Sequence, residues 1–512
     1  MKNSSRLIFF LALIKFILPF FLQNSIYELH RDEFLYLAEG HHMAWGFMEV
    51  PPLLSVFAWL TNAFGGSMFW VKIWPSLFGA LTFIVVGKTI QSLGGKTFAL
   101  FLAFLSFIFT AYLRVHFLFQ PNFLEIFFWT MIAYSLIRYT QTEKNYWLYV
   151  FGVSTGLGML SKYSVAFFIV SILGGLLLTN QRKVFSNKHL YYSALLGFII
   201  FLPNLIWQFI RHFPVVYHMS ELQRTQLQYL SPVDFLVNQF GMFLPCAFIW
   251  FGGLIFVCFS RSAKQYRFIG LAYLLVIALL LIGRGKSYYS LGVYPILFAF
   301  GACRLERLTA QRFTILRYGL ILLIGFLGYF FVPLLLPLFE PAKLAAFYEK
   351  RNLKNTGLLK WEDQKDHPLP QDFADMLGWE EMTKKMAVAY NTLDSDEKKN
   401  AIVFCDNYGQ AGAINYYRKK YHLPEAYSDN ASFLYWIPDS LKFDNLVLLT
   451  DDKKEMEHPF IKNFVAAELT DSVTSPYARE RGSLIIVLKK GNADFKKMII
   501  EKLAKDKAKV KW

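Results

Sequence analysis

Cysteine is scarce in this sequence, and its placement excludes two kinds of site. Only 4 cysteines occur in 512 residues. Cys246, Cys258 and Cys303 fall in or beside apolar runs, and Cys405 stands alone in the last third of the chain. We therefore expect no disulfide framework in that last third, and the cysteine–histidine spacing of a zinc site does not occur.

Charged residues are also few. They make up 18% of the chain against 55% hydrophobic residues, whereas a soluble globular protein has roughly 25% charged residues. This argues against a soluble enzyme or a disordered chain and indicates an integral membrane protein. Residues 1–339 hold 25 Lys and Arg residues but only 10 Asp and Glu residues. Residues 340–512 hold 28 Lys and Arg residues and 27 Asp and Glu residues, so their charges nearly balance. The basic residues are dispersed between apolar runs without a dense stripe, so we expect no nucleic-acid binding.

Residues 1–339 contain eleven apolar runs that approach the ~20 residues needed to cross a bilayer. The predicted spans are 7–26, 66–87, 97–115, 121–138, 145–161, 164–180, 190–210, 233–259, 267–283, 288–303 and 313–339. Lys and Arg concentrate in every second connecting loop, so the positive-inside rule places the N-terminus in the cytoplasm. Eleven spans then place residues 340–512 in the periplasm. No repeat and no inverted symmetry is evident.

Residues 340–512 have the pattern of a small α/β domain. Strands are predicted at 401–405, 446–450 and 483–488, and helices at 371–390, 410–420 and 495–507. The segment 407–412 either helps to bind an acceptor or makes a tight turn, and we favour the turn. The sequence therefore predicts a transmembrane domain over 1–339 and a periplasmic α/β domain over 340–512.

The carboxylates of the membrane part are unevenly distributed. Five of the ten lie between Glu28 and Glu49, in the first predicted periplasmic loop, residues 27–52. Aromatic and aliphatic residues make this loop amphipathic, so we expect helices along the membrane interface. Asp32 and Glu33 open one such helix, where a carboxylate can take a proton from an incoming hydroxyl.

Other interpretations of this loop stay open. Glu49 can pair with these carboxylates, bind a metal or orient an acceptor. For Glu28 and Glu39 we favour ordinary solvated carboxylates. The adjacent His41 and His42 do not face one direction on a helix, so we expect no shared metal site.

Lys162, Arg284 and Lys286 lie on the predicted outer side, against the positive-inside bias. A cation at a span end is costly without an anionic partner. Together with the hydroxyls of Tyr288 and Tyr289, these cations can bind phosphate oxygens. The alternative is that Arg284 and Lys286 extend to lipid headgroups.

Another outer span end carries His116, Asn122 and Glu125. Glu125 is either a structural counter-ion or a member of the site. A carboxylate base, outward cations and an apolar bundle together suit a substrate with a phosphate and a long lipid tail. The cations would hold the phosphate as it leaves.

Five motifs resemble bacterial members of glycosyltransferase family 39, the protein mannosyltransferase-like and lipid A aminoarabinose transferase-like enzymes of the GT-C fold. They are HRDEFLYLAEGHHMAWGFMEVPPL, GLGMLSKYS, GKSYYSLGVYP, LPQDFADMLGWEEM and DNYGQAGAINYY, in this order along the whole chain. Many members have Asp-His before the Pro-Pro pair, where this chain has Glu49-Val50. No role of that histidine is therefore carried over.

The resemblance implies a bacterial inner-membrane enzyme that transfers a sugar, with inversion, from a polyprenyl-phosphate donor such as an undecaprenyl-phosphate-linked sugar. The acceptor would be a periplasmic hydroxyl or phosphate on lipid A, a protein or a glycan. Asp32 matches the family's catalytic carboxylate, and Glu33 and Glu49 would assist it or position the acceptor. No cofactor and no catalytic metal is expected. The donor would lie near Lys162, Arg284, Lys286, Tyr288 and Tyr289, with Arg31, His116, Asn122 and Glu125 as accessory candidates.

Two other functions fit part of the sequence. A transporter or flippase of lipid-linked sugars would have broken helices and ionisable groups near the membrane midplane, whereas here the acids cluster in an interfacial loop. A non-catalytic binder or assembly subunit would use residues 340–512 as its interaction module. The presence of Asp32 and Glu33 weighs against this third interpretation.

Overall fold

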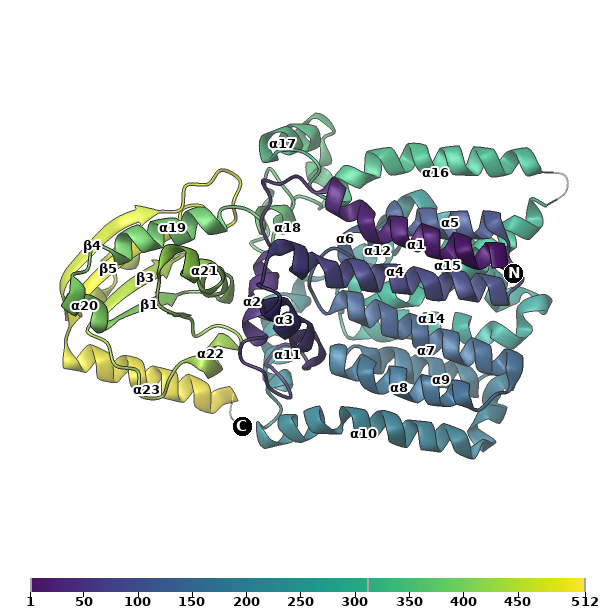
Figure 1. The fold of residues 1–512 in the computed structure, drawn as a ribbon, viewed down its shortest axis with the longest axis horizontal. Helices are drawn as coiled ribbons and strands as arrows, with labels where there is room; N and C mark the ends of the chain where they lie inside the picture. Colours follow the sequence, from purple (N-terminus) through teal and green to yellow (C-terminus); the bar gives the residue numbers. More distant parts are fainter. Residues whose placement is uncertain (1, 311–312, 511–512) are drawn as a thin grey trace.

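The computed structural model describes residues 2–310 and 313–510. Helices from the first two-thirds of the chain run side by side as a bundle, and an α/β domain is joined to one end of it (Figure 1). The bundle helices are α1 (Lys2–Leu22), α4 (Met68–Ser92), α5 (Thr97–Ile108), α7 (Asn122–Thr142), α8 (Tyr146–Ser161), α9 (Val165–Leu177), α10 (Lys188–Ile210), α12 (Pro232–Gly241), α13 (Ala247–Phe259), α14 (Arg267–Ile282), α15 (Tyr294–Leu308) and α16 (Thr314–Leu335). Shorter helices connect them: α6 (Tyr112–Val115), η1 (Asn180–Ser186), α11 (Pro214–Thr225), η2 (Leu227–Tyr229), η3 (Leu244–Cys246), η4 (Arg261–Tyr266) and η5 (Ser287–Val293).

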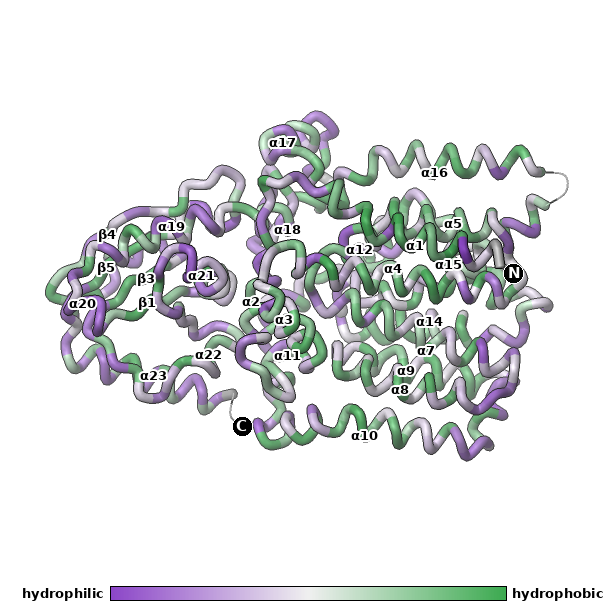
Figure 2. The backbone as a smooth tube through the Cα atoms, viewed as in Figure 1, coloured by the Kyte–Doolittle hydropathy of each residue, from purple (hydrophilic) through white to green (hydrophobic). Residues whose placement is uncertain are grey.

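The bundle is apolar along most of its length (Figure 2). Among the described residues, five helices are long and apolar enough to cross a membrane, and two bent pairs raise the number to seven if each pair is one span. The bent pairs are α9 with η1, at 108°, and α12 with the helix formed by η3 and α13, at 65°. All eleven predicted spans fall on helices, but α5 and α8 have only 12 and 16 residues. The chain is a membrane protein, and the number of eleven spans stays a prediction.

Small residues let neighbouring bundle helices approach closely. A Cβ atom added at Gly152 of α8 would lie 2.2 Å from the carbonyl oxygen of Ser193 on α10. A Cβ atom added at Gly301 of α15 would lie 1.8 Å from the carbonyl oxygen of Ile249 on α13. Backbone-to-backbone van der Waals packing therefore joins these pairs, as is common between membrane helices.

The α/β domain contains a five-stranded sheet with the order β2-β1-β3-β5-β4. Its strands are β1 (Ala401–Cys405), β2 (Ala426–Tyr427), β3 (Asn445–Thr450), β4 (Phe464–Ser472) and β5 (Leu484–Gly491). β1 pairs in parallel with β2 and β3, whereas β5 pairs antiparallel with β3 and β4. The three predicted strands fall on β1, β3 and β5.

Helices cover both faces of this sheet (Figure 1). The segment after the bundle forms α17 (Pro341–Lys350), η6 (Leu353–Thr356), α18 (Gln371–Ala374), α19 (Trp379–Tyr390), α20 (Ser395–Lys399), α21 (Tyr408–Tyr421), α22 (Phe433–Trp436), η7 (Glu455–Glu457), η8 (Pro459–Asn463) and α23 (Ala493–Val510). Val403, Val447 and Val487 share a hydrophobic cluster with α19 and α21. Ile402 and Ile486 point to the other face and share a cluster with α23. Alternate strand residues thus bury both faces of the sheet.

The prediction of one helix over 371–390 is wrong, because this segment forms α18 and α19. The chain turns at Gly378, whose φ of 84° favours glycine. The Cβ atoms of Ser475 and Ala478 lie only 2.9 and 3.0 Å from where a Cβ of residue 378 would be. The break brings the Asp375 carboxylate to 3.7 Å from Nε2 of His30.

α2 (Arg31–Glu39) and α3 (Leu53–Ala63) lie between the bundle and the α/β domain (Figure 1). Seven of the nine residues of α2 are buried. The ring of Phe34 packs against Trp379 and Tyr416 of the α/β domain, with centroids 5.5 and 5.6 Å apart. The predicted interfacial loop is therefore covered by the α/β domain, and the carboxylates of α2 lie at the junction of the two parts.

Candidate active site

Asp32 lies in the first turn of α2, and two distant parts of the chain hold its carboxylate. The Tyr408 hydroxyl donates a hydrogen bond to Oδ1 at 2.7 Å, and the Gln120 amide donates one to Oδ2 at 3.0 Å. The Asp32 N–H donates to Nδ1 of His30, the residue that caps the helix, at 3.1 Å. Asp32 as a whole residue is half-buried, and the two hydrogen bonds to its oxygens fix the orientation of its carboxylate.

Nearby charges decide the protonation state of Asp32. Burial alone raises the pKa of its carboxyl group, but the charge of His30, the hydrogen bond from Tyr408 and the charges of Arg31 and Lys286 outweigh it, and the pKa is lowered. The carboxylate is therefore ionised at neutral pH, as a base that accepts a proton must be.

Glu33, in contrast to Asp32, is enclosed by groups that join neighbouring helices. It is fully buried, and its two oxygens lie 2.6 and 2.7 Å from Nζ of Lys72 on α4. The backbone N–H groups of Phe119 and His30 donate to the same carboxylate at 2.6 and 2.8 Å. These four bonds tie α2 to α4 and to the segment before α7.

Glu49 connects the same loop to the α/β domain. The N–H and the hydroxyl of Ser432 donate to its two oxygens at 2.7 and 2.6 Å. The Met48 N–H in turn donates to the Ser432 hydroxyl at 3.0 Å. Glu49 thus holds the start of α22 against the first loop.

The interpretation of Glu28 and Glu39 as solvated carboxylates is wrong. Glu28 accepts hydrogen bonds from the N–H groups of Trp379 and Glu380 at 2.7 and 2.8 Å, at the N-terminus of α19, where a negative charge is favourable. Glu39 is fully buried, and neither of its oxygens has a hydrogen-bond partner among the described residues. Burial and then the charge of Glu49 raise the pKa of Glu39 well above its usual value.

Lys162 forms a second polar centre where α8 ends. Its ammonium donates to Asn122 at 2.6 Å and to Glu125 at 2.9 Å, both in the first turn of α7. It also lies 4.6 and 5.5 Å from the ring centroids of Tyr289 and Tyr288 in η5. The structure therefore brings together five of the residues that the sequence assigned to the donor and accessory sets.

Gln120 joins this centre to Asp32. The Asn122 amide donates to the Gln120 side-chain oxygen at 3.3 Å, and the Gln120 amide donates to Asp32. A continuous hydrogen-bond chain thus runs from Tyr408 through Asp32, Gln120 and Asn122 to Lys162.

Lys286 adds a second cation beside Asp32. It precedes η5 as its N-cap residue and is half-buried. Burial lowers the pKa of its ammonium, the charges of Glu362 and Asp32 oppose this effect, and Lys162 adds to it. Within the described parts of the chain no hydrogen bond or ion pair holds this ammonium, so it is free to bind an anion.

Three other candidates lie outside this hydrogen-bond chain. Arg284 is exposed and donates to the carbonyl oxygen of Gln228 at 3.0 Å. His116 is fully buried and packs closely against Gly79 of α4. Among the described residues neither of its ring nitrogens has a hydrogen-bond partner. Arg31 stacks its guanidinium on the ring of Tyr408, 4.5 Å from the centroid.

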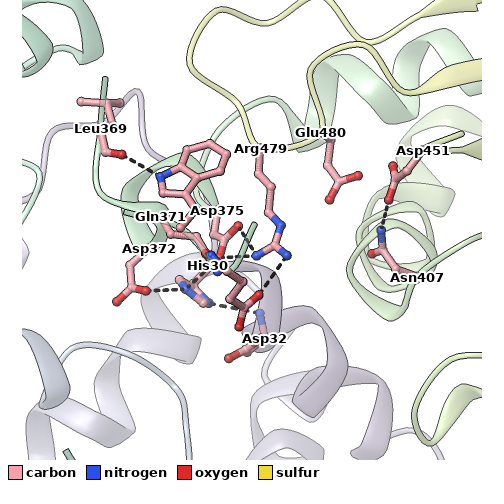
Figure 3. Close-up of polar contacts among 12 residues, drawn as sticks. His30, Asp32, Leu369, Gln371, Asp372, Asp375, Asn407, Asp451, Arg479 and Glu480 are labelled. Carbon is pink, nitrogen blue, oxygen red and sulfur yellow. Dashed lines mark hydrogen bonds and ion pairs between the residues drawn. The ribbon is translucent and has the colours of Figure 1, made fainter. Parts of the chain in front are cut away.

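A second polar network supports His30 from the side of the α/β domain (Figure 3). Nε2 of His30 lies 3.7 Å from Asp375 and 4.0 Å from Asp372. Arg479 reaches Asp375 at 3.4 Å and Glu362 at 3.1 Å. This network surrounds the residue that caps α2, and among the described residues Nε2 of His30 forms no hydrogen bond with it.

Two groups of side chains in the described chain have ligand atoms close enough to hold a metal ion. In one, the donor atoms of His30, Asp372 and Asp375 all lie within 4.8 Å of one another. Arg114 already pairs with Asp372, however, and Arg479 with Asp375, so cations of the chain balance these carboxylates. The other group is Asp452, Glu455 and His458.

The sequence analysis favoured a tight turn for 407–412, the segment that contains Tyr408, and it did not select Gln120. Tyr408 stands 376 residues from Asp32, within the motif DNYGQAGAINYY. That segment begins a helix, α21, with Asn407 as its cap. A tyrosine in the first turn of a helix that follows a buried parallel strand was the available signal, because the ends of such strands commonly carry site residues.

Comparisons with known proteins bear on the family and the fold of the chain. Residues 49–207 match the family model described as dolichyl-phosphate-mannose-protein mannosyltransferase. A curated relative, the lipid A galacturonosyltransferase RgtD of Rhizobium johnstonii, is 24% identical over 240 residues, which is 42% of this chain and 47% of RgtD. The chain thus spans about half the length of this relative.

Solved structures match over nearly the whole chain. ArnT from Cupriavidus metallidurans bound to undecaprenyl phosphate superimposes with a TM-score of 0.64 at 12% identity, covering 95% of this chain and 98% of ArnT. Its apo state gives a TM-score of 0.63 at 12% identity, with the same coverage. The chain therefore has the fold of ArnT, and these findings confirm the predicted resemblance to glycosyltransferases of the GT-C fold.

Proposed function

We propose that this protein of GT-C fold transfers a sugar from a polyprenyl-phosphate donor to an acceptor hydroxyl or phosphate at the outer face of the bacterial inner membrane. The observation that carries the proposal is the placement of one ionised carboxylate, Asp32, beside the cation Lys286 at the end of an apolar bundle, with a second cation, Lys162, joined to Asp32 through Asn122 and Gln120. A base for an acceptor and a cationic site for a lipid phosphate are thus adjacent.

The proposed reaction is a direct displacement. Asp32 takes the proton of the acceptor hydroxyl, and the acceptor oxygen forms a bond to the anomeric carbon of the donor sugar. The bond from that carbon to the phosphate oxygen breaks, so the configuration inverts and the polyprenyl phosphate leaves with the bonding electrons. Lys286 and Lys162 stabilise the charge that grows on the phosphate, while Tyr288 and Tyr289 offer hydroxyls beside it.

Glu33 and Glu49 have positioning roles in this proposal. Glu33 holds α2 against α4 through Lys72, and Glu49 holds the first loop against the α/β domain through Ser432. Neither carboxylate needs to exchange a proton with the substrate.

The names of the similar proteins support the choice of substrates. ArnT was solved with undecaprenyl phosphate, so we propose an undecaprenyl-phosphate-like lipid carrier. RgtD is described as a lipid A galacturonosyltransferase, which makes lipid A the first acceptor to examine, before proteins and glycans. No cofactor takes part in the proposed step.

The test uses the purified protein in vesicles with a panel of undecaprenyl-phosphate-linked sugars and lipid A. We expect release of undecaprenyl phosphate and mass gain of the acceptor, and only when donor and acceptor are both present. The bent helix pairs would also suit a transporter. Movement of the intact donor across the vesicle membrane, without release of undecaprenyl phosphate, would overturn the glycosyltransferase in favour of that transporter.

A further inference from the structure

Helix α21 of the α/β domain docks directly on α2, and two glycines permit the contact. A Cβ atom at Gly412 would lie 2.8 Å from Cβ of Phe34, and one at Gly409 would lie 2.5 Å from Cγ of Arg31. Any larger residue would push the two helices apart. The close approach places the first residue of α21, Tyr408, over the first turn of α2.

The side chain of Tyr408 is held on two sides. The Arg31 guanidinium covers its ring at 4.5 Å from the centroid, a favourable cation–π contact. Its hydroxyl donates to Oδ1 of Asp32 at 2.7 Å. Asn407 caps α21 by accepting the N–H of Gln410 at 3.1 Å, which fixes the turn that carries the phenol.

We propose that Tyr408 is a positioning residue for Asp32, so that the α/β domain completes the active site of the membrane domain. This inference rests on the proposed function only in taking Asp32 as the reacting carboxylate. Of the two side-chain donors to Asp32 within residues 2–310 and 313–510, Gln120 comes from the membrane domain and Tyr408 from the α/β domain. The orientation of the base therefore depends on the docking of that domain.

The phenol also acts on the charge of Asp32. A hydrogen bond to an ionised carboxylate stabilises the ionised form, so its loss raises the pKa of the carboxyl group. The ionisable groups that face Asp32 are His30, Arg31, Tyr36, Lys286, Tyr288 and Tyr408. Loss of the Tyr408 hydroxyl leaves the other five in place, so its effect can be measured separately.

The test is the pH dependence of carbodiimide labelling of Asp32 in the full-length protein, followed by peptide mass spectrometry. The carboxyl oxygen adds to the carbodiimide carbon while its proton goes to a carbodiimide nitrogen, so the labelling rate follows the protonated fraction and the labelling midpoint reports the pKa. We expect Tyr408→Phe to move this midpoint upward by about one pH unit. Asn407→Ala, which loosens the first turn of α21, should move it in the same direction by less.

The matched control is Tyr416→Phe on the same helix. Tyr416 packs on Phe34 and makes no contact with Asp32. The labelling midpoint of Asp32 in Tyr416→Phe should therefore equal that in the wild type. Equal midpoints for Tyr408→Phe and the wild type would overturn the inference. Labelling does not require sugar transfer, so an inactive wild-type protein would reject the proposed function without deciding the role of Tyr408.

Discussion

Lys286 is the residue whose removal most directly tests the phosphate site. Its ammonium has no partner in the described chain and lies near Asp32 and Lys162. We predict that Lys286→Ala raises the apparent KM for the polyprenyl-phosphate donor roughly 10-fold or more, because a charge-assisted contact with phosphate is lost. Transfer kinetics against donor concentration measure this change.

Arg261→Ala is the control for this prediction. Arg261 begins η4, is exposed and lies in a predicted cytoplasmic loop. Its removal should leave the donor KM unchanged. An equal rise for both variants would show that Lys286 contributes only general positive charge.

At the level of residues, part of the candidate site could be predicted from the sequence. Asp32 and Lys162 were predictable because a carboxylate and a cation are rare in apolar surroundings, and each needs a partner there. The position of Tyr408 after a buried strand could mark it as a candidate, but its contact with Asp32 was not predictable, because that contact depends on how α21 packs on α2. His116 and Arg284, like Lys162, are polar residues at predicted outer span ends. The structure places His116 in the bundle core and Arg284 against the backbone carbonyl of Gln228.

The contact between α2 and α4 depends on one buried ion pair, Glu33 with Lys72. We predict that Lys72→Met lowers the free energy of unfolding by about 3–5 kcal/mol, because Glu33 would keep its charge in the interior with no cation beside it. The double variant Glu33→Leu with Lys72→Met should recover much of this loss. Denaturant unfolding of the purified protein in detergent measures both.

Lys343→Met provides the comparison for an exposed pair. Lys343 lies 3.1 Å from Glu340 at the surface of α17, and exposed pairs contribute little. We expect almost no change in the free energy of unfolding for Lys343→Met. A loss for Lys72→Met as small as that for Lys343→Met would mean that the buried pair does not hold the two helices together.

Helices and strands were more predictable than their ends and breaks. Apolar runs mark the bundle helices, and apolar strands mark the sheet. The break at Gly378 was missed because it depends on Ser475 and Ala478, about 100 residues away, and on the turn that Asp375 needs to reach His30. Local patterns do not carry such tertiary requirements.

The orientation of the whole molecule follows from the distribution of Lys and Arg, which predicts that the α/β domain is periplasmic. We predict that a cysteine introduced at Asp396, whose side chain is 89% exposed, reacts in intact cells with a thiol reagent that crosses only the outer membrane. Three of the four native cysteines are buried, so background labelling is low.

A cysteine at Lys264, in a predicted cytoplasmic loop, is the matched position. It should react only after lysis. The reverse pattern, with Lys264 labelled in intact cells and Asp396 only after lysis, would place the α/β domain and Asp32 in the cytoplasm and reject a periplasmic acceptor.

The most direct test of the central claim is the transfer rate of Asp32→Asn in vesicles with the donor sugar that the wild type uses. Asparagine keeps the shape of the side chain but cannot act as a base, so we predict a fall of about 100-fold or more, with unchanged expression and unfolding temperature. The control Asp234→Asn, at an exposed aspartate in the first turn of α12, should transfer at the wild-type rate. Wild-type transfer by Asp32→Asn would contradict the assignment of Asp32 as the base.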